Sequence, residues 1–256
     1  VLAEQKTILS FGQNISLGSC IGGLTKNLPN TNNSRVINTT NSENTLAGVG
    51  FGLLLENINS VFFLKQQDFL TLSVDHLVNT WSSVRNKKLN ASLTFFCVTM
   101  DGGYEGPQSS LNSICDFCSI ANMPGFTISN AEDSSWVILK ELVSPGVRVI
   151  AISQQFLNQE TKKLAFNHEL IDPLNGIHRY GTGAEATIIS LNHAFELAYR
   201  FSEILGVHGV TNSIFNSSAI LPVSMEAVIE HARKTNRVFI FDDTKSANKP
   251  AYKLNN

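Results

Sequence analysis

The chain contains 256 residues, of which 43% are hydrophobic and 16% are charged, so it can bury one large core or the cores of two small domains. Its formal net charge of -2 and its pI of about 6.3 give no sign of the basic surface that draws proteins to nucleic acid or to anionic membranes. We therefore expect neither nucleic acid nor a membrane as a partner.

Strand-like and helix-like segments alternate along the first half of the chain. Strands are expected at residues 7–11, 35–39, 61–64, 93–100 and 148–153. This alternation is typical of parallel strands joined by crossover helices. Residues 1–153 are therefore predicted to form a doubly wound α/β domain with a parallel sheet.

Residues 69–85 carry a clear helical pattern within this half. Apolar residues recur there at spacings of three and four: Leu70, Val74, Leu77, Val78 and Trp81. Asp75 and His76 belong to the same helix, and we interpret them either as polar site residues or as part of the helix surface or an interface.

The pattern changes at residue 154. Residues 154–183 show little periodicity and contain Pro173 and Gly176, so we predict a linker there. In residues 184–256 strands are expected at 186–191, 209–216 and 237–241, with helices at 194–205 and 225–234. This part is predicted to be a second, smaller α/β domain.

Two of the four cysteines, Cys115 and Cys118, form a single Cys-x-x-Cys pair. A lone pair without a second pair or a nearby histidine is a weak sign of zinc. Free cysteine is among the most buried residue types, so we interpret these residues as reduced core cysteines and predict no metal ligands in this chain. A metal enzyme that uses Cys115 and Cys118 is the least favoured alternative.

Four segments, taken in order, carry a resemblance to a known family. They are the strand 35–39 followed by Ser42-Glu43-Asn44 and the spaced glycines Gly48, Gly50 and Gly52; Asp68-Phe69 with residues 75–79; Gly106-Pro107-Gln108-Ser109-Ser110; and residues 186–243. Together they resemble the beta subunit of thiamine diphosphate-dependent 2-oxo acid dehydrogenases, within the transketolase-like superfamily. The resemblance implies a pyrimidine-binding domain at 1–153 and a transketolase C-terminal-like domain at 184–256, which is shorter than in the family.

The resemblance also implies roles for individual residues. In the family, the glutamate that matches Glu43 contacts the pyrimidine ring of thiamine diphosphate, where a carboxyl group favours the reactive imino tautomer. Gln66, Gln67 and Phe69 are then expected at the cofactor, and Gln108, Ser109 and Ser110 at the substrate mouth. Judged without the resemblance, Glu43 is a solvated carboxylate that favours the helix dipole.

Two positions depart from the family pattern. Gln66 and Gln67 stand where the family commonly has an aromatic residue that packs on the pyrimidine, and Phe69, Phe62 or Phe63 are possible replacements for that surface. Ser109 and Ser110 stand where the family usually has a histidine, and a serine hydroxyl does not exchange protons near neutral pH as imidazole does.

In the family, an alpha-type subunit holds the diphosphate and its magnesium. The resemblance therefore implies a heterodimer or heterotetramer in which this chain is the beta-type subunit of an oxidoreductase or transferase. Residues 1–6 do not have the pattern of a signal peptide, so we expect a cytoplasmic location. The donor is expected to be a 2-oxo acid or a ketose-like compound. The alternative is a non-catalytic relative that scaffolds or regulates an alpha-type partner.

Overall fold

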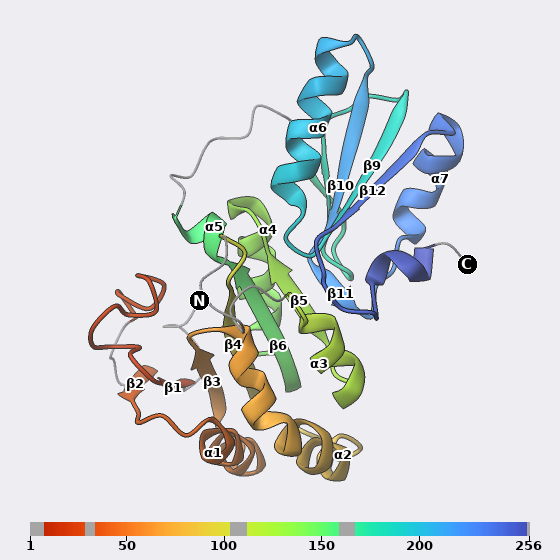
Figure 1. Ribbon diagram of the computed structural model, residues 1–256. Coiled ribbons are helices and arrows are strands. Elements are labelled where there is room, and N and C mark those ends of the chain that lie inside the picture. Colours follow the sequence, from red (N-terminus) through yellow and green to blue (C-terminus); the bar gives the residue numbers. More distant parts are fainter. Residues whose placement is uncertain (1–7, 29–33, 103–111, 159–166, 255–256) are drawn as a thin grey trace.

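The computed structural model describes residues 8–28, 34–102, 112–158 and 167–254. These residues form two sheets with helices on both faces, and Figure 1 shows the two units one above the other. Among the described residues, no helix has the length and apolar character needed to cross a membrane.

The first sheet has seven strands in the order β11-β5-β6-β4-β3-β1-β2. Six of them pair in parallel, and β11 pairs antiparallel with β5. The strands are β1 (Ile8–Gly12), β2 (Ser34–Asn38), β3 (Asn59–Leu64), β4 (Ser92–Thr99), β5 (Gly125–Ile128), β6 (Gly146–Ser153) and β11 (Ala219–Leu221). The doubly wound α/β class is confirmed, although the short strand β5 was not predicted.

Side chains of β4 pack on both faces of this sheet, and all eight of its residues are buried. Leu93, Phe95 and Cys97 join a core with residues of α1 (Glu43–Leu55) and α3 (Ile114–Ala121). On the other face, neighbouring β4 residues join a core that includes Trp136 of α4 (Ala131–Trp136) and Val137 of the π-helix Val137–Glu141. A central parallel strand that is covered on both faces usually has a nearly continuous run of hydrophobic residues, and the sequence of β4 has such a run.

The predicted helix 69–85 is not one regular helix. It consists of a 3-10 helix (Gln67–Ser73), a π-helix (His76–Thr80) and the short α2 (Trp81–Val84). The apolar face that the spacing indicates is nevertheless buried, since Leu70, Leu77 and Trp81 are at most 7% exposed. The apolar positions are thus buried even though the segment changes helix type along its length.

The second sheet has five strands in the order β12-β9-β10-β8-β7. The strands are β7 (His168–Asp172), β8 (Ile177–Tyr180), β9 (Ala186–Leu191), β10 (Asn212–Ser217) and β12 (Val238–Asp242). Figure 1 shows α6 (Phe195–Val207) and α7 (Glu226–Thr235) on opposite sides of this sheet. Ile188 packs on the α6 side and Ile189 on the α7 side, as alternation along a strand requires.

The segment 154–183, predicted as a linker, differs from that prediction in its second half. It begins with α5 (Gln154–Asn158), and it later forms the hairpin of β7 and β8 in the second sheet. Pro173 and Gly176 belong to the turn of this hairpin, in which the Asp172 carboxylate accepts hydrogen bonds from the backbone N–H groups of Leu174 and Asn175 at 3.0 and 3.1 Å. Turn residues between two short strands carry the same local signal as a linker.

Strand β11 joins the two units. It follows β10 of the second sheet directly but pairs with β5 of the first sheet, and the backbone N–H of Thr127 donates to the carbonyl of Ser218 at 2.8 Å. The first sheet therefore contains residues from the part of the chain predicted as the second domain.

The three spaced glycines of α1 meet different surroundings. A Cβ atom at Gly50 would lie 2.7 Å from Cδ1 of the fully buried Leu93, and one at Gly48 would lie 2.9 Å from Nε2 of His76. A Cβ at Gly52 would meet nothing within 4 Å. The close approach of α1 to the sheet and to the π-helix thus accounts for two of the glycines and not for the third.

We expect Gly52→Ala to stabilise the fold by roughly 0.5–1 kcal/mol, because alanine loses less conformational entropy in a helix. Gly50→Ala is expected to destabilise the fold by about 1–3 kcal/mol, since the added methyl group must displace a packed leucine. Urea unfolding of both variants measures the difference, and stabilisation by Gly50→Ala would contradict the close packing of α1 on β4.

Candidate functional site

The carboxyl ends of the six parallel strands lie at one edge of the first sheet. Ligands of open α/β sheets bind at this kind of edge. Glu43 follows β2, Gln66 follows β3, and Thr99 and Ser153 end β4 and β6. Several of the residues predicted for the site are thus brought to the same edge.

Glu43 is the first residue of α1, and its side chain is buried, with 8% of its surface exposed. The preceding Ser42 does not cap the helix with its side chain, because its hydroxyl donates instead to Oγ1 of Thr45 at 2.9 Å. A carboxylate in the first turn of a helix interacts favourably with the unpaired N–H groups there. Judged by its helical position alone, Glu43 was expected to be a solvated carboxylate. In the structure it is buried instead.

Two contacts position Glu43. With the Asn41 amide oriented so that its nitrogen faces the carboxylate, that nitrogen donates to both carboxylate oxygens at 3.0 and 2.6 Å. The Ser73 hydroxyl donates to the backbone carbonyl of Glu43 at 3.2 Å, which joins the start of α1 to the 3-10 helix. A neutral amide therefore holds the Glu43 carboxylate near the carboxyl ends of the parallel strands.

Gln66, Gln67 and Phe69 lie at the start of the 3-10 helix. Gln67 is fully buried, and Gln66 is half-buried with its side-chain oxygen lacking a hydrogen-bond partner among the described residues. Phe69 is half-buried and packs against the core beneath α1. The other two phenylalanines considered for a stacking surface, Phe62 and Phe63, are buried core residues, so Phe69 is the most exposed of the three.

Burial raises the pKa of Asp68, and one of its carboxylate oxygens has no partner among the described residues. Asp75 is exposed and accepts a hydrogen bond from the Asn79 amide at 2.7 Å. His76 Nδ1 lies 2.8 Å from Thr80 Oγ1, and its ring packs beside Gly48 and Phe51. Asp75 therefore makes a contact within its own helical segment, whereas His76 also packs against α1.

The predicted mouth residues Gln108, Ser109 and Ser110 lie outside the described residues. Asp101 and Asn112 flank that segment, and both line a cavity of about 540 Å³ between the two units. Its other walls include Thr99 and Ser153 from the first unit and His193 from the second. The cavity thus lies at the edge of the first sheet where the parallel strands have their carboxyl ends.

His193 is a polar residue of this cavity that sequence reasoning missed. Its Nε2 lies 2.9 Å from Oγ1 of Thr99, and its backbone N–H donates to the Asp243 carboxylate at 2.9 Å. The Asn112 amide donates to the same carboxylate oxygen at 3.1 Å. His193 Nδ1 is buried and has no hydrogen-bond partner among the described residues.

Cys115 and Cys118 are buried free cysteines, and burial raises the pKa of Cys115 to about 12 and that of Cys118 well above its usual value. The reactive and metal-binding form of cysteine is the thiolate. These protonated thiols therefore give no support to the alternative that the pair serves a metal enzyme.

A second polar cluster was also missed. Asp133 of α4 lies beside His168 of β7 and His178 of β8, at the junction of the two units. The signal was hidden because the histidines lie in the segment interpreted as a linker.

Comparison with known proteins found no family model that matches the chain. The pyruvate dehydrogenase E1 component subunit beta of Rhizobium meliloti is 20% identical over 215 residues, which cover 82% of this chain and 46% of that protein. The 2-oxoisovalerate dehydrogenase subunit beta of Bacillus subtilis is 24% identical over 217 residues, covering 82% and 65%. The chain thus spans about half to two thirds of the length of these relatives.

A solved structure described as a split-gene transketolase, inactive beta4 tetramer, superposes with a TM-score of 0.65 at 17% identity and covers 97% of this chain and 77% of that one. This likeness shows a transketolase-like fold. Together with the sequence relatives it confirms the resemblance to beta subunits of 2-oxo acid dehydrogenases that residues 35–52 and the later segments indicate.

Proposed function

We propose that this chain is the pyrimidine-binding, beta-type subunit of a heteromeric thiamine diphosphate-dependent enzyme. Its donor is a 2-oxo acid or a ketose-like compound, and the reaction cleaves or forms a carbon-carbon bond with transfer of an acyl or ketol group. The observation that carries the proposal is the buried carboxyl group of Glu43 at the start of α1, within a chain similar to beta subunits of 2-oxo acid dehydrogenases.

Glu43 has a chemical task in this proposal. When bound, thiamine diphosphate supplies the carbon nucleophile for the reaction. The Glu43 carboxyl group would hydrogen-bond a nitrogen of the pyrimidine ring and exchange a proton with it, while Asn41 fixes the orientation of the carboxyl group. A carboxyl group shielded from water makes this hydrogen bond with little competition from solvent.

Gln66, Gln67 and Phe69 are proposed to bind the aminopyrimidine ring together with Glu43. Gln66 has a buried side-chain oxygen without a partner among the described residues, and Phe69 is half-buried. Gln66 follows β3 and Glu43 begins the helix after β2, so both lie beyond the carboxyl ends of strands of the first sheet. Gln67 is fully buried.

The donor substrate is proposed to approach through the cavity near His193. Gln108, Ser109 and Ser110 are proposed to complete this mouth. The imidazole of His193 is proposed to supply a polar group there, in place of the histidine that the mouth segment lacks.

A partner subunit completes the proposed site. The alpha-type subunit holds the diphosphate and its magnesium, and the assembly is a heterodimer or a heterotetramer. The beta4 form of the split-gene transketolase, described as inactive, supports a requirement for a second polypeptide.

Calorimetric titration with thiamine diphosphate and magnesium tests the proposal. We expect no binding to this chain alone and binding of one cofactor per site when it is mixed with a co-expressed alpha-type subunit. The alpha-type subunit alone is the control. A mixture that assembles, as judged by gel filtration, and yet binds no cofactor would contradict the proposed function and leave a scaffolding relative.

A further inference from the structure

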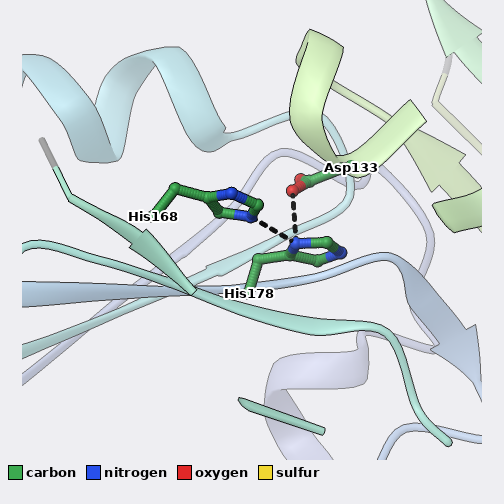
Figure 2. Close-up of side chains that lie close together, drawn as sticks. All are labelled: Asp133, His168 and His178. Carbon is green, nitrogen blue, oxygen red and sulfur yellow. Dashed lines mark hydrogen bonds and ion pairs between the residues drawn. The ribbon is translucent and has the colours of Figure 1, made fainter. Parts of the chain in front are cut away.

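Three side chains converge at the junction between the two units, and Figure 2 shows them turned toward one another. His178 Nδ1 lies 2.7 Å from Nε2 of His168 and 3.5 Å from a carboxylate oxygen of Asp133. All three atoms lie within 4.8 Å of one another. Asp133 belongs to the first unit and the two histidines to the hairpin of the second, so the cluster spans the junction.

Asp133 is a buried carboxylate, with no exposed surface. Its hydrogen-bond donors among the described residues are neutral groups: the Tyr180 hydroxyl at 2.5 Å, the Asn130 amide at 2.8 Å and the Asn216 amide. Burial of a carboxylate is unfavourable unless the charge is paired with a cation or coordinates a metal ion. The same three donors fix the carboxylate in place, as outer hydrogen bonds do for metal-binding carboxylates.

The two imidazole rings lie side by side in one plane. Their planes differ by 11°, and the 5.0 Å between ring centroids equals the separation of the two nitrogens plus the two ring radii. The two nitrogens therefore lie on the line between the rings and share one hydrogen atom. This is the geometry of a hydrogen bond rather than of stacked rings, and it places both nitrogens beside the Asp133 carboxylate.

We propose that Asp133, His168 and His178 bind a divalent transition-metal ion of the zinc class, with water in the remaining position. Two imidazole nitrogens and one carboxylate oxygen form a donor set that zinc uses in proteins. The bound ion replaces the hydrogen atom between the rings and neutralises the buried carboxylate. It links α4 of the first unit to the β7–β8 hairpin of the second, and the proposal does not depend on the cofactor chemistry.

The change needed for binding is small. Tetrahedral coordination with zinc–nitrogen distances of about 2.0–2.1 Å separates two ligand nitrogens by about 3.3 Å. The present separation of 2.7 Å must therefore increase, and the two rings must turn out of line. His168 is exposed on the edge strand β7, so its ring can make this movement while the buried His178 and Asp133 keep their places.

Metal binding is tested on the tag-free chain after removal of metal by chelation. We expect one equivalent of Zn²⁺ by elemental analysis after dialysis, a tetrahedral absorption spectrum with Co²⁺, and a rise of Tm with Zn²⁺. His168→Ala is expected to weaken binding by more than about 100-fold, because loss of an outer partner alone costs 10–100-fold. The exposed His208, outside the cluster, gives the matched control His208→Ala, which should bind as the parent does.

Because His168 is exposed, its replacement leaves the fold intact, and circular dichroism verifies this. Absence of a stoichiometric ion in the parent chain overturns the proposal. So does equal binding by the parent and His168→Ala, or an equal loss in His168→Ala and His208→Ala. Asp133→Asn gives an independent check, since it keeps the shape of the side chain but removes the charge and replaces one acceptor oxygen with an amide donor, and it is expected to weaken Zn²⁺ binding.

Discussion

Replacement of Glu43 by glutamine is expected to reduce turnover of the assembled enzyme on the order of 10²- to 10⁴-fold, the range over which proton transfer by a positioned group contributes to catalysis. Glutamine has the size of glutamate and can still contact Asn41, but its amide cannot hold and release a proton at the pyrimidine ring. The measurement is the steady-state rate of the chain mixed with its alpha-type partner at saturating cofactor.

The control for this variant lies at the other end of the same helix. Glu56 is exposed and follows the last residue of α1, so Glu56→Gln makes an equal change of charge without touching the site. We expect full turnover from Glu56→Gln and unchanged assembly of both variants by gel filtration. Turnover of Glu43→Gln close to that of the parent would exclude the proposed role of Glu43, even if the cofactor binds.

Replacement of Phe95 by alanine is expected to destabilise the fold by about 3–5 kcal/mol. Phe95 has no exposed surface and lies between two other rings, with centroids 5.9 Å from Phe62 and 6.4 Å from Phe51 of α1. Its removal leaves a cavity between β4 and α1, and α1 is the helix that begins with Glu43. Urea unfolding followed by circular dichroism measures the loss.

Tyr252 provides the matched control, because it is an aromatic residue with 58% of its surface exposed. Tyr252→Ala is expected to change the free energy of unfolding by less than about 0.5 kcal/mol, as is usual for exposed positions. If Phe95→Ala cost as little as Tyr252→Ala, the aromatic cluster beneath α1 would not be the support that we assign to it.

Local patterns predicted much of the first sheet. The run 93–100 is hydrophobic at nearly every position, which is typical of a central parallel strand, and the structure confirms β4 there with every side chain buried. Glu43 was predicted as a site residue from its position between a strand and a glycine-spaced helix. The structure places it at the first residue of α1. Both features depend on residues that are close together in the chain.

Local patterns gave wrong or incomplete predictions where two different structures have the same sequence features. Pro173 and Gly176 occur in linkers and in hairpin turns alike, and only the pairing of β7 with β8 and of β8 with β10 distinguishes the two. The three glycines of α1 look equivalent in the sequence, yet only Gly48 and Gly50 face close neighbours. The difference comes from what packs against the helix.

The sequence by itself therefore determined the alternation of strands and helices, the α/β class and the position of Glu43, because periodicity and helix starts are properties of neighbouring residues. Only the tertiary structure decided which distant residues meet. His193 contacts Thr99 across 94 positions, Asp133 contacts Tyr180 across 47, and β11 returns to the first sheet from the second. Such contacts follow from the paths of the strands and from the packing of one unit on the other, and no local pattern encodes them.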